Sequence, residues 1–437
     1  MKNIAVIGTG YVGLVSGAGI SDFGHNVVCA DIDKNKIKHL QNGEIPIYEP
    51  GLHELVNRNV QSARLLFSSD VNKSIEDADV IFIAVGTPEG ENGASDLTAV
   101  LEVARAIGKN LNSYKVICTK STVPIGTGAE ISKIINETSN NSIEFDYVSN
   151  PEFLREGSAV KDFLWPDRVI IGASNVRAFD IMKNVYRPLY INETPVIQTT
   201  IETAELIKYA SNAFLSVKIS YMNEIANMCD EIGADVHVVS KAMGIDGRIS
   251  PKFLHPGPGF GGSCFPKDTK ALVSMAEKFG TNLNVVESAI AANQLQKERM
   301  VKKLFKLLNN DVKGKTIAIL GLAFKAQTDD VRESPSINII NALINNGANV
   351  KAFDPAANDN MKKLFEDLDT YMSWEETVKD ADCVVIMTEW NEFRGINLSK
   401  LKELVKHPNL LDCRNILKID DLEKQGFNYD NVGRKKR

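Results

Sequence analysis

Short apolar runs recur towards both ends of the chain, with helix-like segments between them. In the first part these runs cover residues 2–7, 26–30, 79–85, 115–119, 145–149 and 168–172. Helix-like patterns such as 97–111 and 128–137 separate several of them, and a similar alternation resumes at 316–320, 349–353, 383–388 and 409–412. Strands that alternate with helices predict parallel, doubly wound sheets. We therefore expect an α/β fold with two Rossmann-like doubly wound domains, joined by a long central helix and a helical dimerisation region.

The middle of the chain has the pattern of helices. Thr199 with Glu202 after it is typical of a capping box, and Gly233 is a plausible C-terminal stop. The segment between them is apolar on most faces, as in helices buried between domains or subunits, so we expect a homodimer through it. Further helical patterns cover 235–243, 269–279 and 285–308. The predicted domains are residues 1–198, 199–308 and 309–437.

Composition narrows the class of protein. The length of 437 residues exceeds one typical domain, and 43% hydrophobic with 24% charged residues is ordinary for a soluble globular protein. A net charge of -6 implies no general affinity for nucleic acid. The six histidines are dispersed and no CxxC spacing occurs, so no metal site is predicted.

The cysteines and the chain start predict the compartment. Cys29, Cys118, Cys229 and Cys383 lie in apolar or helical patterns and are expected in the core, which favours a reducing environment over a disulfide framework. The first strand leaves no room for a signal peptide, and no apolar run is long enough to span a membrane. We therefore expect a cytoplasmic protein with no membrane segment.

A dinucleotide-binding motif opens the chain. Gly8, Gly10 and Gly13 form GxGxxG between a predicted strand and a predicted helix. In that context the glycines let the backbone approach a pyrophosphate at the helix N-terminus. Asp31 ends the next strand, where its carboxylate can accept the ribose hydroxyls and would repel a 2'-phosphate. The expected cofactor is therefore NAD rather than NADP.

Two further loops follow strands of the same sheet, at 86–88 with Thr87 and at 121–124 with Thr122. Loops at the carboxyl ends of such a sheet meet the ligand, although each segment alone has the pattern of an ordinary turn. The second half begins with 320–325, which lacks GxGxxG and is a poorer dinucleotide site. Lys325 in that segment could still hold a phosphate.

Cys264 lies in the run 257–268, which has four glycines before the thiol and Lys267 and Asp268 after it. The glycines indicate backbone that bends sharply or lies close to a ligand. A cation favours the thiolate and a carboxylate can position water, so the run suits covalent thiol chemistry. A buried structural cysteine is the alternative. Together with NAD, a nucleophilic thiol suggests oxidation through a thioester.

Two pairs of polar residues are further candidates for catalysis. Lys208 and Asn212 share one face of the central helix, where they could stabilise an alkoxide, unless the lysine merely extends to solvent. Glu152 and Glu156 follow a strand, and their spacing predicts that they align on one helical turn. They could transfer protons near the thiol, or act only as favourable partners of a helix dipole.

The run 259–268, the segment 150–157 and the helix with Lys208 and Asn212 occur together in the order typical of nucleotide-sugar dehydrogenases. The chain thus resembles the UDP-glucose/GDP-mannose dehydrogenase family over nearly its whole length. The resemblance implies two successive NAD-dependent oxidations at one carbon, which convert the primary alcohol of UDP-glucose to the carboxylate of UDP-glucuronate. It also implies that the first domain binds NAD, the last domain binds the UDP-sugar, and the central domain carries the cysteine loop.

The resemblance implies a role for each candidate. Cys264 would attack the intermediate aldehyde, Lys208 and Asn212 would hold the oxyanions, Asp268 and Thr122 would position water, and Glu152 would assist proton transfer. NAD contacts, besides the glycines and Thr87, are implied at Tyr11, Val12, Asp31, Lys36, Thr122, Glu156, Lys267 and Arg332. UDP-sugar contacts are implied at Glu152, Phe153, Leu154, Lys208, Phe253, Leu254, His255, Pro256, Gly257, Gly261 and Lys325. With this substrate, the glycines before Cys264 are expected to leave room for the sugar.

Two arginines complete the implied substrate site. Arg248 resembles an arginine that is contributed across a dimer interface. Arg414 lies in Asp412-Cys413-Arg414, where many members of the family have Asp-Gly-Arg, and is implied to bind the sugar.

Three other functions stay open. A UDP-N-acetylhexosamine 6-dehydrogenase would use the same residues with a different pocket at the sugar 2-position, although 163–168 and the single-cysteine loop resemble the glucose branch. A one-step β-hydroxyacid-type dehydrogenase shares the dinucleotide domain and a lysine–amide pair but has no use for the thiol. An NAD- or nucleotide-sensing protein is expected to lack a catalytic residue, and Cys264, Lys208, Asn212 and Asp268 are all present.

Overall fold

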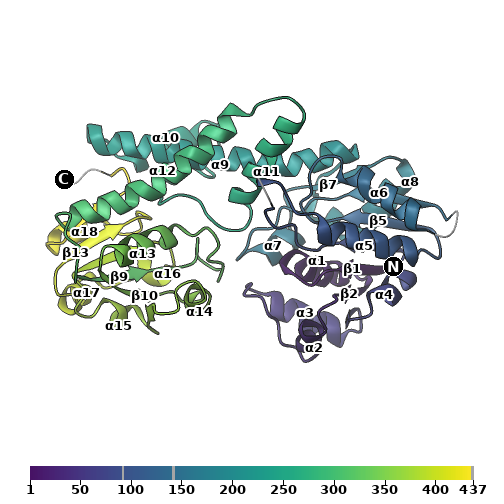
Figure 1. The fold of residues 1–437 in the computed structure, drawn as a ribbon, viewed down its shortest axis with the longest axis horizontal. Coiled ribbons are helices and arrows are strands. Elements are labelled where there is room, and N and C mark those ends of the chain that lie inside the picture. The colour runs from purple at the N-terminus through teal and green to yellow at the C-terminus, as the bar shows by residue number, and fades with distance from the viewer. Residues whose placement is uncertain (91–92, 140–142, 435–437) are drawn as a thin grey trace. The chain divides into compact units, whose positions relative to one another are not determined.

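The computed structural model describes residues 1–90, 93–139 and 143–434. The chain divides into two compact units, the first made of residues 1–211 and 274–279, the second of residues 212–273 and 280–434. Each unit contains one sheet, which Figure 1 colours from purple to teal in the first unit and from green to yellow in the second. The predicted α/β class with two doubly wound sheets is confirmed.

The first sheet has eight strands in the order β3-β2-β1-β4-β5-β6-β7-β8. All neighbours are parallel except β6 and β7, which are antiparallel, so the expectation of an entirely parallel sheet is wrong at this pair. The apolar pattern does not predict β3 and β8, because these edge strands expose part of their apolar surface: Leu66 is 56% exposed. The strands are β1 (Asn3–Ile7), β2 (Asn26–Ala30), β3 (Leu65–Ser68), β4 (Val80–Ile83), β5 (Lys115–Thr119), β6 (Phe145–Ser149), β7 (Val169–Ala173) and β8 (Val196–Thr199).

Helices cover both faces of this sheet, which is why its central strands are apolar without alternation. Ile4 and Val6 of β1 pack with one set of helices, whereas Ala5 and Ile7 pack with another. The first set is α1 (Tyr11–Asp22), α2 (Lys34–Gln41), α3 (Leu52–Gln61), α7 (Ala159–Leu164) and α8 (Val176–Val185). The second set is α4 (Val71–Asp77), α5 (Thr98–Lys109) and α6 (Thr127–Thr138).

The second sheet has six parallel strands in the order β11-β10-β9-β12-β13-β14. Its four predicted strands are confirmed, and the edge strands β11 and β14 are not predicted by the apolar pattern. The strands are β9 (Thr316–Leu320), β10 (Asn349–Phe353), β11 (Asp369–Thr370), β12 (Cys383–Ile386), β13 (Asn409–Asp412) and β14 (Asn428–Asn431). The helices around it are α13 (Pro335–Asn345), α14 (Asn358–Lys362), α15 (Trp374–Val378), α16 (Asn391–Arg394), α17 (Leu398–Leu404) and α18 (Ile419–Lys424).

The long central helix is α9 (Ile201–Ile232), and its residues are shared between the two units. Its N-terminus is capped by Thr200, whose Oγ1 accepts the N–H of Thr203 at 3.2 Å. The predicted capping box at Thr199 is therefore wrong by one residue, because Thr199 still belongs to β8. Gly233 has a φ of +70°, the left-handed conformation that ends many helices, so the predicted stop is confirmed.

Three more helices follow the central one, near the residues that the pattern predicts. They are α10 (Val236–Ile245), α11 (Phe265–Lys278) and α12 (Asn284–Leu307). In the part of the chain that the structure describes, no helix is long and apolar enough to span a bilayer.

Candidate active site

The cofactor loop joins β1 to α1, where Tyr11 and Val12 are the first helical residues. A Cβ at Gly8 would lie 2.6 Å from Ala84 O, and a Cβ at Gly13 would lie 1.9 Å from Gly8 O. A Cβ at Gly10 would meet no protein atom within 4 Å. Gly8 and Gly13 are thus required by the protein's own packing, whereas Gly10 faces open space at a helix N-terminus. This glycine loop at a helix N-terminus forms a cradle that fits the pyrophosphate of a dinucleotide.

Asp31 follows β2 and lies beside this loop. Its Oδ2 accepts the backbone N–H and the hydroxyl of Thr9, each at 2.8 Å, and lies 3.5 Å from Lys36 Nζ. Partial burial opposes ionisation, but the hydrogen bonds from Thr9 and Asp33 and the charge of Lys36 outweigh it and lower the pKa of Asp31. Asp31 is therefore an ionised acceptor, as recognition of ribose hydroxyls requires.

Glu49 is a buried carboxylate that the sequence pattern does not single out. Its side chain accepts hydrogen bonds from the Tyr11 hydroxyl, from the Gly157 N–H at 2.6 Å and from the Ala159 N–H at 2.7 Å. Burial, the hydrogen bond to Glu49 and the charges of Glu49 and Glu156 raise the pKa of Tyr11. Glu49 thus ties the start of α1 to the segment before α7.

The loops after β4 and β5 are joined, since Thr87 Oγ1 donates to Thr122 O at 3.0 Å. The buried Lys120 precedes Thr122 by two residues and donates to Asn150 Oδ1 at 3.1 Å and to the Tyr186 hydroxyl at 3.2 Å. Burial lowers the pKa of Lys120 to about 8. The structure thus places both predicted threonines at the carboxyl edge of the sheet, next to an unpredicted buried lysine.

Lys208 and Glu152 form a buried ion pair in the first unit. Lys208 Nζ lies 2.8 Å from Glu152 Oε1, with 4% and 6% of the two side chains exposed. The alternative in which Lys208 extends to solvent is therefore wrong. The ring centroid of Phe153 lies 5.4 Å from Lys208 Nζ and 3.6 Å from the Arg168 guanidinium carbon, and Leu154 packs partly buried against the core.

The segment 151–157 is a loop, so the prediction that Glu152 and Glu156 align on one helical turn is wrong. The next helix begins only at Ala159. The Glu152 carboxylate accepts the N–H of Leu154, a local bond from side chain to backbone that competes with helix formation. The charge of Glu156 acts instead on Tyr11, whose pKa it helps to raise.

Among the six cysteines only Cys264 is not buried. Its carbonyl accepts the N–H of Asp268 at 2.8 Å, which makes Cys264 the N-cap residue of α11. The positive end of a helix dipole favours a thiolate. The predicted core positions of the other four are confirmed, and one further cysteine is also buried: Cys29, Cys118, Cys229 and Cys383, with Cys413.

Asp268 is a buried carboxylate in the first turn of α11. Its Oδ2 accepts a hydrogen bond from Asn212 Nδ2 at 2.7 Å, and its Oδ1 accepts one from Lys267 Nζ at 2.7 Å. Asn212 comes from α9. Three predicted residues therefore meet in the second unit, one helical turn after Cys264.

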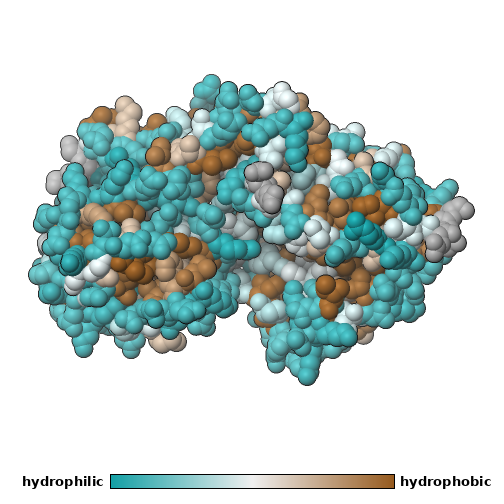
Figure 2. Space-filling view, in the orientation of Figure 1, coloured by the Kyte–Doolittle hydropathy of each residue, from teal (hydrophilic) through white to brown (hydrophobic). Residues whose placement is uncertain are grey.

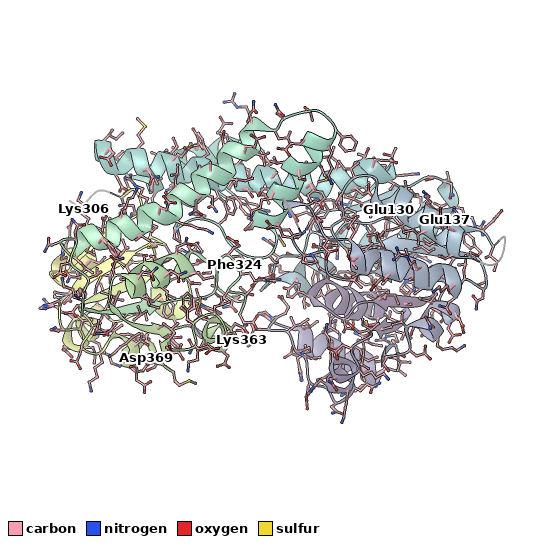
Figure 3. The ribbon with its side chains drawn as sticks, viewed as in Figure 1. Glu130, Glu137, Lys306, Phe324, Lys363 and Asp369 are labelled. Atoms are coloured by element: carbon pink, nitrogen blue, oxygen red, sulfur yellow. The ribbon has the colours of Figure 1, made fainter. Side chains whose placement is uncertain are left out.

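The glycines before Cys264 are required by protein atoms. A Cβ at Gly261 would lie 2.4 Å from Glu333 O, and a Cβ at Gly262 would lie 2.7 Å from the ring of Phe324, which Figure 3 labels. Gly259 and Gly262 have φ angles of +112° and +83°. The packing of the loop on its own unit thus requires these glycines, and their role towards a sugar stays a prediction.

Several predicted substrate residues gather near the loop after β9. Arg414 Nε donates to Met387 O at 2.8 Å and its Nη2 donates to Phe324 O at 2.6 Å. A Cβ at Gly257 would lie 3.3 Å from Arg414 Nη1, and Lys325 Nζ lies 5.4 Å from the Phe324 ring centroid. The second unit thus brings Gly257, Lys325 and Arg414 to one place.

Two other predicted arginines project outwards. Arg248 is 89% exposed in its side chain and pairs with Asp246 at 2.6 Å, and Arg332 is 66% exposed and pairs with Asp330 at 2.7 Å. Exposure of Arg248 is what a contribution to a neighbouring subunit would need.

The segment before the glycine loop alternates between buried and exposed residues. Leu254 and Pro256 are buried and His255 is exposed. Phe253 has a φ of +64°, and its ring lies edge-on to Phe265 at 6.1 Å. A bulky residue in the left-handed region marks strain, which is typical of ligand-binding loops.

In residues 1–90, 93–139 and 143–434, no three or more His, Cys, Asp or Glu side chains form a group that could hold a metal ion.

A glycine cradle for a pyrophosphate, with an ionised carboxylate that can accept ribose hydroxyls, defines an NAD-dependent dehydrogenase, and a partly exposed thiol lies at a helix N-terminus. The chain belongs to the UDP-glucose/GDP-mannose dehydrogenase family: the family's NAD binding domain matches residues 2–190, its central domain 202–295 and its UDP binding domain 318–419. The resemblance of the sequence to this family and the choice of NAD are confirmed.

Individual relatives agree with this assignment. The UDP-glucose 6-dehydrogenase of Rhizobium meliloti (strain 1021) is 50% identical over 434 residues, 99% of each chain. The structure of a UDP-glucose dehydrogenase from Pyrobaculum islandicum superposes with a TM-score of 0.92 at 34% identity, covering 99% of this chain and 98% of the other. That of a UDP-D-ManNAc dehydrogenase from Pyrococcus horikoshii has a TM-score of 0.87 at 26% identity, covering 99% and 100%.

Proposed function

We propose that this protein oxidises UDP-glucose to UDP-glucuronate in two steps with two NAD, through a covalent bond to Cys264. The observation that carries the proposal is the position of Cys264: among the six thiols it alone is not buried, and it caps a helix whose first turn holds Asp268. A thiol in that position suits addition to an aldehyde, which a one-step dehydrogenase does not need.

The first oxidation takes the C6 alcohol to an aldehyde. Bound NAD supplies the hydride acceptor for both oxidations, and the alcohol proton leaves through water that Thr122 and Asp268 position. The Lys208 ammonium stabilises the developing alkoxide, because it is desolvated and is held in place by Glu152. Asn212, fixed by Asp268, donates its amide to the same kind of oxygen.

The second oxidation proceeds on Cys264. The thiolate adds to the aldehyde carbon, and the carbonyl oxygen takes up a proton to give a thiohemiacetal. Loss of a hydride and of the hydroxyl proton gives a thioester, and water then cleaves the C–S bond and returns the thiol, with Glu152 assisting proton transfer. Overall R-CH2OH, two NAD⁺ and water give R-COO⁻, two NADH and three protons, so atoms and charge balance.

The binding roles rest on the resemblance to the family. For NAD they fall on the glycine cradle and on Tyr11, Val12, Asp31, Lys36, Thr87, Thr122, Glu156, Lys267 and Arg332. For the UDP-sugar they fall on Glu152, Phe153, Leu154, Lys208, Arg248, residues 253–257, Gly261, Lys325 and Arg414.

Glucose is favoured over an N-acetylated sugar by degree of similarity. The relative that is 50% identical carries the UDP-glucose name, whereas the solved UDP-D-ManNAc dehydrogenase is only 26% identical. Turnover with UDP-glucose and with UDP-N-acetylhexosamines separates the two, because activity on the N-acetylated sugars alone contradicts the proposal.

The stoichiometry of NADH tests the covalent mechanism. With limiting UDP-glucose the wild-type protein is expected to form two NADH per sugar, because the aldehyde is captured and oxidised again. Cys264→Ser lacks the thiolate and is expected to give fewer than two NADH per sugar and no thioester. Cys413→Ser, a change at a buried thiol, is the matched control. An unaltered yield from Cys264→Ser would refute the role of the thiol.

A second copy of the chain is the partner that the surface of α9 fits. Phe214, Tyr221 and Met228 repeat at heptad spacing and are 65%, 49% and 57% exposed. Figure 2 shows apolar residues among polar ones in the region that Figure 1 labels α10 and α12. A heptad stripe on one helix is self-complementary in a two-fold dimer. Phe214→Asp is expected to shift sedimentation from dimer to monomer, whereas Glu54→Gln on α3 leaves it unchanged; a monomeric wild type contradicts the dimer.

The cysteines fit a reducing cytoplasm. No disulfide joins any two of the six, all of which lie in the described residues, and five of them are buried. Mass spectrometry of the protein, alkylated as the cells are lysed, is expected to show six thiols after denaturation, and a disulfide would contradict this location.

A further inference from the structure

The loop 257–262 forms neither helix nor strand, so other groups must satisfy its backbone N–H and C=O groups. Three buried amides do so: Asn293 and Gln296 on one face of α12, and Asn223 on α9. They are only 6%, 1% and 2% exposed. We call these three residues the loop clamp. None of the steps of the proposed reaction uses them.

Asn293 holds Phe260 from both sides of its backbone. The Phe260 N–H donates to Asn293 Oδ1 at 2.7 Å, and Asn293 Nδ2 donates to Phe260 O at 3.0 Å. This is the pair of bonds that a neighbouring strand would make, supplied here by one side chain.

Gly257 is held in the same way by two side chains. Its N–H donates to Asn223 Oδ1 and its carbonyl accepts from Gln296 Nε2, both at 2.8 Å. Asn227 Nδ2 donates to Gln296 Oε1 at 2.9 Å, which fixes the orientation of the glutamine amide. The clamp therefore satisfies both backbone groups at each of two loop residues.

The loop backbone between Gly257 and Phe260, and after Phe260, has little space to move. A Cβ at Gly259 would lie 3.0 Å from Asn293 Oδ1 and 3.1 Å from Lys297 Cγ. Lys297 in turn donates to Glu333 O at 3.2 Å, and the Gly262 N–H donates to Arg332 O at 2.8 Å. The loop is thus fixed up to Gly262, two residues before the thiol.

Cys264 is consequently held on both sides, by the clamped loop before it and by the first turn of α11 after it. We propose that Asn293 and Gln296 are positioning residues for the Cys264 thiol, and that they set the fraction of aldehyde captured before it escapes. The link to the aldehyde rests on the proposed function, whereas the link to the thiol does not. A reacting atom misplaced by about 1 Å loses roughly a hundredfold in rate, so a loosened loop lowers capture strongly.

Asn293→Leu removes both bonds to Phe260 while keeping the number and branching of the side-chain heavy atoms, and Gln296→Met removes the bond to Gly257 O at constant length. Gln294→Leu is the matched control, because Gln294 is exposed on the same helix and bonds only to Glu298 among the described contacts, at 3.1 Å. Circular dichroism establishes that each variant is folded.

The first measurement is aldehyde release. Free aldehyde is trapped with a hydrazine during turnover of UDP-glucose and compared with the NADH formed. Asn293→Leu and Gln296→Met are expected to raise the aldehyde released per NADH by about tenfold, and Gln294→Leu to leave it unchanged. Folded variants that slow both oxidations equally and release no aldehyde overturn the proposal, since that is the result of a merely structural role.

The second measurement needs no substrate. Iodoacetamide alkylation of Cys264 is followed by mass spectrometry as a function of pH, and the half-maximal rate is expected at higher pH in Asn293→Leu and Gln296→Met, because the thiol no longer sits firmly at the end of α11. Profiles identical to wild type overturn the proposal. If wild-type protein forms no NADH with UDP-glucose, the proposed function fails while the alkylation profiles still decide the positioning role. If Asn293→Leu does not fold, Gln296→Met decides it.

Discussion

Glu205 is the group whose titration should most clearly change stability. It lies on α9, is 2% exposed, and accepts hydrogen bonds from the Gly126 N–H at 2.7 Å and the Gly128 N–H at 2.9 Å at the start of α6. Burial raises the pKa of Glu205 from 4.5 to about 7, against the two N–H groups, which lower it. Burial and local hydrogen bonds therefore act in opposite directions at one carboxyl group, and the larger effect can be measured.

The magnitude follows from linkage. Because the folded protein binds this proton more tightly than the unfolded chain, the contribution of Glu205 is most favourable below about pH 4.5 and is lost as pH rises through about 7. A pKa difference of one corresponds to about 1.4 kcal/mol, so full ionisation costs about 3 kcal/mol. Between about pH 5 and about pH 8 the free energy of unfolding of wild type should fall by about 2.5 kcal/mol relative to Glu205→Gln, which does not titrate.

Urea unfolding of wild type and Glu205→Gln, followed by circular dichroism across this pH range, measures that difference. Glu130→Gln is the matched control, because Glu130 is an exposed carboxylate in the first turn of α6, labelled in Figure 3. Its difference from wild type should stay flat with pH. If the free energy of unfolding of wild type rises with pH relative to Glu205→Gln, the reasoning is refuted. That result would mean that the N–H groups at the helix N-terminus outweigh burial.

Two further predictions concern the cofactor loop and the buried ion pair. Gly13→Ala should prevent folding, since its Cβ would lie 1.9 Å from Gly8 O, whereas Gly10→Ala should fold and weaken NAD binding about tenfold by calorimetry; equal behaviour of the two variants contradicts the assignment. Lys208→Met should lower the free energy of unfolding by about 3 kcal/mol in urea, because it leaves Glu152 charged and buried. Adding Glu152→Gln to Lys208→Met should restore the free energy of unfolding, while turnover stays about a hundredfold below wild type. Full activity of the double variant would exclude Lys208 from catalysis.

Burial on both faces is what made the fold predictable. Residues 4–7 of β1 and all of β12 are apolar and covered by helices on each side, so the positions of these strands follow from the sequence. Edge strands β3 and β8 have exposed positions and give no such signal. The spacing of Glu152 and Glu156 suggested a helix, but a hydrogen bond from the Leu154 N–H to the Glu152 side chain decides for a loop. Spacing alone cannot reveal such a bond.

The candidate site was predictable where chemistry and local pattern coincide. Cys264 stands out by its glycine run, and Lys208 and Asn212 by their shared helix face. Glu49 and Asn293 do not stand out, because their role is to satisfy backbone groups far away in the chain: Glu49 and Gly157 are 108 residues apart, and Asn293 and Phe260 are 33 apart. Any carboxylate or amide in a helix or turn has the same local sequence signature as these.

The two sheets repeat one backbone device at the turn after their first strand. Gly8 and Gly321 have φ angles of +103° and +101°, and the N–H that follows each donates at 2.8 Å to the carboxylate after the second strand, Asp31 in the first unit and Asp354 in the second. The turn by itself therefore does not distinguish a cofactor site from a structural one.

The two turns differ in how exposed the carboxylate is and in the protein hydrogen bonds that it already accepts. Asp31 keeps 15% of its side chain exposed. Asp354 is 2% exposed and accepts hydrogen bonds from four backbone N–H groups and from the Trp390 indole at 3.1 Å. A ribose hydroxyl could reach Asp354 only by displacing one of these charge-assisted bonds, each worth about 1.5–3 kcal/mol, with no gain in their number. The second sheet thus uses its carboxylate to build the turn, and Asp31 is the one that can accept a dinucleotide ribose.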